Sequence, residues 1–410
     1  MQRVKLPAGV ISSSQARTVC LAADRFGRGG IHLTTRGSME IHWLREADLP
    51  AVKRLLSTTG LSSRGACGGA VRGITCGTQG TIDFPQIEAL AHKLQRHFTG
   101  NPRFERLPKK FKIGIESSIK GRRHLIQDAG LVLNRSENCR TWYDLWVAGG
   151  LGREPQPGFL LATDVAEERV IPLLEAILRV YEAHTPAGKR LKHLLNKIGE
   201  EEFRRLVDAD PAASEELPPF IGIAETTIPA AITSQHRITA HFFAGMLSSK
   251  DLLRLADFAD IRSDSALMVT ANQDIAFHLP AESDTNAVRI ELKQSGFSIF
   301  EQEEVTFRIC PGTHECRVGL TPTREIARAV LDAMGPAARK LTWAISGCHN
   351  SCTQPQLADI GIISSRLVSG DDGCRTPRFD LYDLKDSGLG KKTGASLNMD
   401  ELIAAVQELS

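Results

Sequence analysis

Residues 346–362 read SGCHNSCTQPQLADIGI, and an earlier stretch, residues 309–316, reads ICPGTHEC. Together the two stretches contain four cysteines: Cys310, Cys316, Cys348 and Cys352. Five residues separate the first pair and three separate the second, so each pair fits on one loop. A cubane iron–sulfur cluster needs four soft thiolates that converge from such loops. The pattern therefore predicts an iron–sulfur cluster site.

Two other uses of the cysteines are less favoured. A tetrahedral zinc site also takes four cysteines, but zinc ribbons usually have shorter ligand spacings of about two to four residues. A disulfide framework fits poorly, because the chain has 410 residues and an odd number of cysteines, nine. We expect the remaining thiols to be ordinary buried ones: Cys20, Cys67, Cys76, Cys139 and Cys374.

The bulk properties favour a redox enzyme of the cytoplasm. With 42% hydrophobic residues, the chain is long enough for two or three domains with substantial cores. Its first residues, MQRVKLPAGVISSSQ, lack the apolar run of a signal peptide, and no segment approaches the length of a membrane span. The net charge is only +2, so we expect neither nucleic acid nor a membrane as a partner.

The chain contains an internal duplication. Residues 33–43, LTTRGSMEIHW, have a counterpart in residues 268–278, MVTANQDIAFH, and helical patterns flank both. In this alignment Arg36 corresponds to Ala271. Further along, RLPKKFKIGIES in the first half takes the place of ARKLTWAISGCHN in the second. The pattern predicts an α+β protein made of two similar halves.

Lys110 and Lys112 are candidates for binding an anion. They are two residues apart on a predicted strand, so both face one side while Phe111 faces the other. Like charges on one face repel each other unless an anion lies between them. The alternative is a strand face exposed to solvent.

A glycine-rich stretch, residues 149–152, reads GGLG. It lacks the preceding strand and the full G-x-G-x-x-G spacing of a dinucleotide-binding loop. We therefore interpret it as a tight turn.

The signature S-G-C-x(3)-C-x(6)-D-I-G-I and the duplication resemble the sirohaem-dependent sulfite and nitrite reductases over essentially the full chain. The resemblance implies a pseudo-twofold α+β fold in which ferredoxin-like half-units alternate with cluster-region units. The expected boundaries are a first ferredoxin-like half-unit over 1–58, a first sirohaem and substrate-cation unit over 59–215, a second half-unit over 216–299 and a [4Fe-4S]-binding unit over 300–410.

The resemblance also implies roles for individual residues. The catalytic cations that hold the oxyanion and relay protons would be Arg36, Arg72, Lys110 and Lys112. The cluster ligands would be the four cysteines, and Cys352 would in addition bridge the cluster to the sirohaem iron. Further contacts to sirohaem are expected from Thr35, Arg64 and Asn350.

The implied reaction is the six-electron reduction of sulfite to sulfide at a sirohaem coupled to a [4Fe-4S] cluster. Reduction of nitrite to ammonia is the alternative. Precorrin-3B synthase of cobalamin biosynthesis shares the layout but generally departs at the substrate cations, all of which are present here. The residues reveal no flavin or nicotinamide site, so we expect electrons from a separate ferredoxin or flavoprotein.

Overall fold

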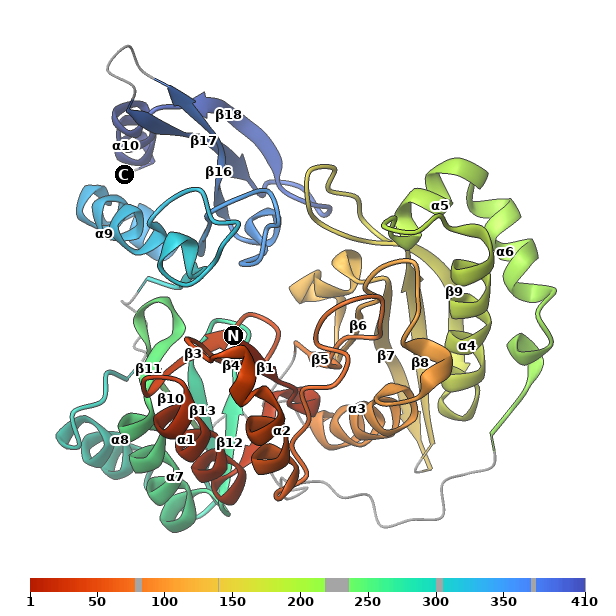
Figure 1. Cartoon of the computed structure of the whole chain (residues 1–410), viewed down its shortest axis with the longest axis horizontal. Coiled ribbons are helices and arrows are strands. Elements are labelled where there is room, and N and C mark those ends of the chain that lie inside the picture. The colour runs from red at the N-terminus through yellow and green to blue at the C-terminus, as the bar shows by residue number, and fades with distance from the viewer. Residues whose placement is uncertain (78–82, 139, 218–235, 300–304, 370–373, 410) are drawn as a thin grey trace.

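A computed structural model describes residues 1–77, 83–138, 140–217, 236–299, 305–369 and 374–409. The chain forms three lobes, and the lobe that contains the N-terminus is built from two segments far apart in the sequence (Figure 1). These segments are the two ferredoxin-like half-units. The other two lobes are the cluster-region units, one coloured orange through yellow to green and one blue in the figure.

Each half-unit consists of four short strands and two helices within the described residues. The first contains β1 (Gln2–Val4), β2 (Val10–Ser12), α1 (Ser13–Phe26), β3 (Gly30–Thr34), β4 (Ser38–Ile41) and α2 (Leu49–Ser57). The second contains β10 (Arg237–Ala240), β11 (Met246–Ser248), α7 (Ser249–Arg262), β12 (Ala266–Val269), β13 (Ile275–His278) and α8 (Thr285–Gln294). The helix starts are encoded locally, because Ser12 and Ser248 each begin a capping box at α1 and α7.

The two half-units exchange a strand. One sheet has the order β1-β4-β3-β11 and the other β10-β13-β12-β2, so β2 and β11 each complete the sheet of the opposite copy. The hydrophobic core of this lobe draws on both copies for the same reason. The half-units therefore form one intertwined domain, which the sequence pattern did not reveal.

Matching hydrogen bonds show which residues correspond between the two copies. The Thr34 hydroxyl accepts a hydrogen bond from the Arg36 amide at 3.3 Å, and the Thr270 hydroxyl accepts one from the Asn272 amide at 3.2 Å. Arg36 therefore corresponds to Asn272, and the predicted equivalence with Ala271 is wrong by one residue. The alignment slipped because the turn sequences differ, whereas the turn geometry is preserved.

The two cluster-region units share one topology. The first contains β5 (Thr75–Cys76), α3 (Phe84–Phe98), β6 (Ile113–Glu116), β7 (Ala129–Glu137), β8 (Arg140–Val147), β9 (Phe159–Ala166), α4 (Glu167–His184), α5 (Leu191–Ile198) and α6 (Glu200–Asp208). The second contains β14 (Phe307–Ile309), α9 (Thr323–Ala333), β15 (Trp343–Ser346), β16 (Ile360–Ser369), β17 (Arg375–Asp383), β18 (Lys391–Leu397) and α10 (Met399–Glu408). Their sheets run β5-β6-β7-β8-β9 and β14-β15-β16-β17-β18, with the first three strands parallel in each.

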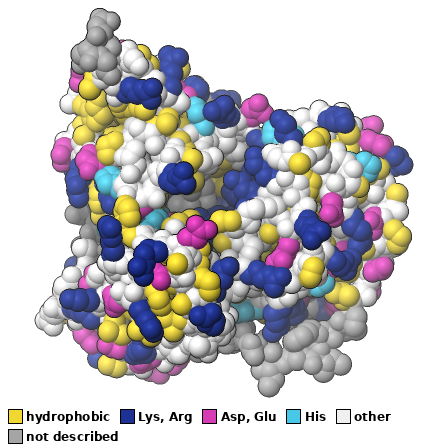
Figure 2. Space-filling model, in the orientation of Figure 1, with side chains coloured by type: hydrophobic (Ala, Val, Ile, Leu, Met, Phe, Trp, Pro, Cys, Tyr) yellow, Lys and Arg dark blue, Asp and Glu magenta, His cyan; other side chains and the backbone are white. Residues whose placement is uncertain are grey.

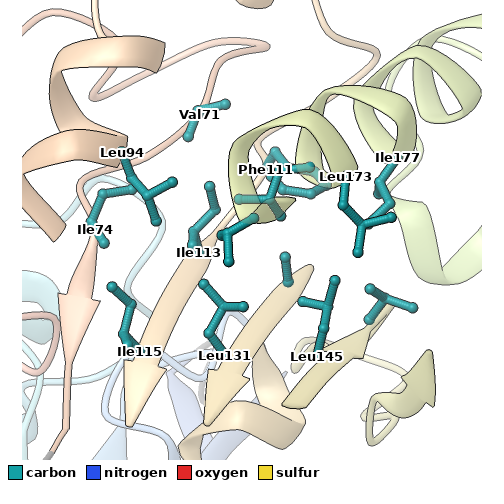
Figure 3. Packing of buried hydrophobic residues seen from close by; sticks show 14 of the residues in the cluster. Val71, Ile74, Leu94, Phe111, Ile113, Ile115, Leu131, Leu145, Leu173 and Ile177 are labelled. Carbon is teal, nitrogen blue, oxygen red and sulfur yellow. The ribbon is translucent and has the colours of Figure 1, made fainter. Parts of the chain in front are cut away.

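The first cluster-region unit has the largest of these cores, in which α4 covers the β6–β8 sheet (Figure 3). Leu131 and Leu145 point from the sheet toward Leu173 and Ile177 of α4. Burial of each such side chain contributes about 1.5–3 kcal/mol to stability. This packing fixes the strand ends from which the site is built.

Among the described residues, no helix is both long and apolar enough to cross a membrane. We keep the four segments expected from the sequence as proposed domains. The strand exchange links the first of these segments to the third.

Candidate cofactor and anion site

The four cysteines lie on two loops that leave the same edge of a parallel sheet. Strands β14 and β15 are parallel neighbours, and Ile309 is in register with Ile345. Parallel strands end at a common edge, so the loop after β14, with Cys310 and Cys316, meets the loop after β15. The amide of Cys310 donates to the Ile345 carbonyl at 3.1 Å, and the Leu320 amide donates to the Gly347 carbonyl at 2.8 Å.

The packing of these loops fits a cluster site. The Gly347 amide donates a hydrogen bond to the Cys310 sulfur at 3.1 Å, and a Cβ at Gly347 would lie 3.0 Å from the Thr323 side chain. Burial raises the pKa of the Cys310 thiol to about 12. Such a thiol gives up its proton only to a strong ligand partner such as iron. The soft donor set and the amide aimed at sulfur therefore suit an iron–sulfur cluster.

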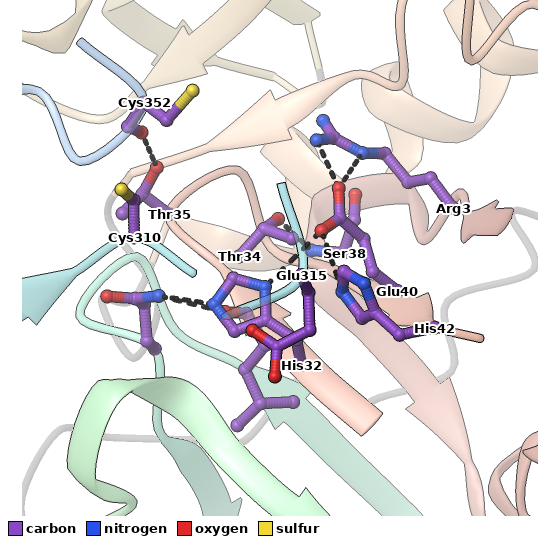
Figure 4. Close-up of polar contacts among 12 residues, drawn as sticks. Arg3, His32, Thr34, Thr35, Ser38, Glu40, His42, Cys310, Glu315 and Cys352 are labelled. Carbon is purple, nitrogen blue, oxygen red and sulfur yellow. Dashed lines mark hydrogen bonds and ion pairs between the residues drawn. The ribbon is translucent and has the colours of Figure 1, made fainter. Parts of the chain in front are cut away.

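Cys352 lies near cations of the first half of the chain. Its side chain is accessible to solvent, yet burial is the main cause that raises the pKa of its thiol. Lys112 and Arg3 act in the opposite sense and lower that pKa through their charges. The Thr35 hydroxyl donates to the Cys352 carbonyl at 2.7 Å, which ties the first half-unit to the cysteine loop (Figure 4).

A cavity of about 490 Å³ opens beside this loop. Its volume lies in the range of small-molecule and cofactor sites. Among the described residues, its lining contains six cations and a single carboxylate, and it reaches Cys348 and Asn350. The cations are Lys109, Lys110, Lys112, Arg153, Arg190 and Lys192, and the carboxylate is Glu154. Figure 2 shows Lys and Arg side chains gathered at the hollow between the lobes. The cavity therefore suits a polyanionic ligand.

Lys110 and Lys112 both line the cavity, and Phe111 between them is fully buried on the other side. They lie just before β6 rather than within it, with Phe111 in a single bridge to Val71. Burial lowers the pKa of both lysines, that of Lys112 well below its usual value. The neighbouring charges of Arg36 and Arg190 lower the pKa of Lys112 further. Binding of an anion would relieve this repulsion.

Arg36 and Arg72 are largely occupied by hydrogen bonds. Arg36 donates to the Gln127 side chain at 3.1 Å and to the Gly73 carbonyl at 2.9 Å, and it lines a small pocket separate from the large cavity. Arg72 donates to backbone carbonyls in the 65–70 loop, among them that of Gly68 at 2.9 Å. In the described structure Arg72 therefore holds its own loop in shape.

The remaining sequence candidates lie apart from one another. Asn350 is exposed at the cavity wall. Arg64 is 58% exposed and forms a two-pronged ion pair with Glu105, at 2.7 and 2.8 Å. Its guanidinium fork is thus already engaged at the surface. Thr35 contacts the cysteine loop through its hydroxyl, as described above.

Of the four other cysteines that the structure describes, two are not buried. Cys20 and Cys76 are buried as expected, but Cys67 and Cys374 are exposed, so the expectation of ordinary buried thiols is wrong for these two. Both lie in loops outside the sheets. Cys139 lies outside the described residues.

Arg3 is a cation that sequence reasoning missed. Strand β1 pairs with β4 so that Arg3 lies opposite Glu40, and the Arg3 Nε donates to Glu40 Oε1 at 3.0 Å (Figure 4). Its charge acts on Arg36, Arg72 and the Cys352 thiol. The signal in the sequence was weak, because the pairing joins residues 37 positions apart.

Glu40 is also flanked by two buried histidines. Its Oε2 lies 3.3 Å from His32 Nδ1 and 3.4 Å from His42 Nε2, a spacing that could also hold a metal ion. The Gln273 amide nitrogen, however, lies 3.1 Å from His32 Nε2 and donates to the Leu33 carbonyl. In the described structure the Glu40 carboxylate joins Arg3 and the two histidines in one polar cluster.

Comparisons with known proteins agree over the whole chain. Residues 1–58 match the family model described as the nitrite/sulfite reductase ferredoxin-like half domain, and residues 78–214 match the nitrite and sulphite reductase 4Fe-4S domain. A ferredoxin–nitrite reductase of Synechococcus elongatus is 27% identical, over 98% of this chain and 81% of that protein. A sulfite reductase [ferredoxin] of Mycolicibacterium paratuberculosis is 23% identical, over 100% and 77%. The solved structure of the Mycobacterium tuberculosis NirA protein superposes with a TM-score of 0.82 at 21% identity, over 99% of this chain and 79% of that one.

Proposed function

Because the chain belongs to the sirohaem-dependent sulfite and nitrite reductase family, we propose that it reduces sulfite to sulfide with six electrons. The family's cofactors are sirohaem and a [4Fe-4S] cluster. When bound, they store and deliver single electrons to the substrate. The observation that carries the proposal is the cation-lined cavity beside Cys348.

The chain's own residues have distinct parts in this proposal. The four cysteines, Cys310, Cys316, Cys348 and Cys352, would hold the cluster, and Cys352 would in addition serve the sirohaem. The cavity lysines and Arg153 would neutralise the carboxylates of sirohaem, and among them Lys110 and Lys112 would bind the oxyanion. Arg3, Arg36 and Arg72 add positive charge behind them, and lysine ammonium groups donate protons to oxygens that leave as water.

Charge favours sulfite over nitrite. Sulfite is partly doubly charged at neutral pH, whereas nitrite carries one charge, so the cavity cations that the sirohaem carboxylates leave unpaired would attract sulfite more strongly. Nitrite is the second candidate, because the Synechococcus elongatus relative carries that activity in its name. The electron donor we propose is a separate ferredoxin or flavoprotein.

The test is steady-state kinetics of anaerobically purified protein that shows the absorption bands of cluster and tetrapyrrole. We expect turnover of sulfite with reduced ferredoxin or reduced methyl viologen, and no turnover with NADPH alone. Failure to reduce either anion in protein loaded with both cofactors contradicts the proposal. A kcat/KM for nitrite at least about tenfold above that for sulfite replaces sulfite with nitrite as the substrate.

The same cavity predicts a pH dependence. A lysine binds an anion only while it is protonated, and burial lowers the pKa of Lys112 and Lys110. Anion binding should therefore be strong at low pH and should weaken as pH rises, well before the value of about 10.4 for a free lysine. Nitrite is the suitable probe, because its own charge is constant across the neutral and alkaline range. A KM for nitrite that stays flat up to the pKa of a free lysine contradicts the assignment of these lysines.

A further inference from the structure

Asp128 holds the backbone of Lys112 in place. Asp128 is fully buried and directly precedes β7, and its Oδ2 accepts a hydrogen bond from the Lys112 amide at 2.8 Å. The amide of Asp128 in turn donates to the Lys112 carbonyl at 3.0 Å. The Asp128 carboxylate thus lies beside a lysine whose ammonium group is needed for an anion.

Arg190 occupies this carboxylate from the opposite side. It comes from the start of α5, and its Nε and Nη2 donate to the two Asp128 oxygens at 3.2 and 2.7 Å. The side chains of both residues are almost entirely buried, so the pair is little screened by solvent. A two-pronged pair between a guanidinium and a carboxylate is among the strongest arrangements of these groups.

The glycine-rich stretch at 149–152 provides the space for Arg190. The Gly149 carbonyl accepts a hydrogen bond from Arg190 Nη2 at 3.3 Å. A Cβ on Gly150 would lie 2.4 Å from Arg190 Nη1, which no side chain can do without displacing the guanidinium. Gly150 is therefore a requirement of the Arg190 site, and it also forms a bridge to Gln156.

The second cluster-region unit shows which of these contacts belong to the fold and which are specific to the site. There Asp359 directly precedes β16, and its Oδ2 accepts hydrogen bonds from the Thr342 amide at 2.8 Å and from the Thr342 hydroxyl at 2.7 Å. Thr342 precedes β15 as Lys112 precedes β6. The aspartate–amide contact thus belongs to the fold of both copies. In the first copy Arg190 forms an ion pair with the Asp128 carboxylate. In the second copy the Thr342 hydroxyl forms a hydrogen bond with the Asp359 carboxylate instead.

We propose that Arg190 is a positioning residue for anion reduction: it occupies the Asp128 carboxylate, so that the Lys112 ammonium stays available for the anion. This inference rests on the proposed function. Without Arg190, a buried carboxylate beside Lys112 would pair with the ammonium and compete with the substrate. Gly150 maintains the arrangement, because it leaves room for the guanidinium.

The charges around Lys112 agree with this role. Burial, Arg36, Arg190 and Lys110 lower the pKa of Lys112, and Asp128 raises it. The Cys352 thiol also senses the charge of Lys112. Arg190 and Asp128 thus act on Lys112 in opposite directions, so that the loss of one charge and the loss of both have different consequences.

The decisive experiment is a mutant cycle in the holoenzyme. For Arg190→Met we expect the KM for nitrite to rise about tenfold while kcat changes by less than about threefold, because Asp128 is freed to bind Lys112. The double variant Arg190→Met/Asp128→Asn should recover a KM within about threefold of the wild type, since the introduced amide keeps an oxygen for the Lys112 backbone but carries no charge. The dissociation constant of phosphate, measured by thermal shift, should follow the same order.

Each outcome decides the inference. An unchanged KM in Arg190→Met overturns it, and so does a double variant that is not rescued, because Arg190 would then contact the anion itself. If Arg190→Met fails to fold, Gly150→Ala displaces the guanidinium without removing it and should raise the KM in the same way. Asp359→Asn is the matched control and should leave the KM unchanged. If the wild-type protein reduces neither anion, the proposed function is wrong. Phosphate binding by the same variants then still tests whether Asp128 pairs with Lys112 when Arg190 is absent.

Discussion

The Cys352→Ser variant is expected to lose both the iron–sulfur cluster and the tetrapyrrole, and with them at least about 100-fold of the reductase activity. Serine oxygen is a harder and poorer ligand for iron than a thiolate. Cys352 follows Cys348 on the loop that reaches the cation-lined cavity, and the charges of Lys112 and Arg3 act on its thiol. We expect this thiolate to serve both the cluster and the sirohaem.

Iron, acid-labile sulfide and extracted tetrapyrrole are the quantities to measure. Cys374→Ser is the matched control, because Cys374 is also exposed but lies outside the two cysteine loops. It should retain both cofactors. Full occupancy of both cofactors in Cys352→Ser contradicts the bridging role. Loss of the cluster in Cys374→Ser would mean that Cys374, and not one of the four cysteines, is a ligand.

The Lys112→Met variant is expected to keep its cofactors but to lose about 10²–10³-fold in kcat, the usual cost of removing one charge-stabilising donor. Methionine preserves much of the length of the side chain and its packing. It removes the positive charge of the Lys112 ammonium group. Burial and the neighbouring cations make that charge unfavourable until an anion binds. The variant should also bind phosphate more weakly.

Lys340→Met provides the comparison for this substitution. Lys340 stands three residues before β15, as Lys110 stands three residues before β6, but it is exposed to solvent. Its removal should leave kcat and KM for both anions unchanged. Wild-type turnover in Lys112→Met, with cofactor content verified by absorption, excludes Lys112 from the mechanism.

Local sequence patterns were sufficient for the overall class of the protein. Cysteine spacing and the alternation around Phe111 depend on residues close together in the chain, and they indicated the cluster loops and the shared direction of Lys110 and Lys112. The duplication followed from repeated patterns of the same kind. The comparisons bear out the family and its cofactors, whereas the roles of the individual site residues stay predictions.

Other features depend on contacts between distant segments, which leave little local trace. The exchange of β2 and β11 joins strands more than two hundred positions apart, and the shift from Ala271 to Asn272 emerged only from matching hydrogen bonds. Strand pairing with Glu40 fixes the position of Arg3. Backbone carbonyls accept hydrogen bonds from the Arg72 side chain, which we expected to be free to bind the anion.

By itself the sequence determined which chemical groups the protein has: four thiolates on two loops, a duplicated α+β frame and a surplus of cations in the first half. The tertiary structure alone decided which cations meet. Arg190 reaches Asp128 across 62 positions because Gly150 has no side chain, and that pair leaves Lys112 facing the cavity. The physical reason is that an electrostatic site depends on distances in space, which long-range packing sets and local patterns do not encode.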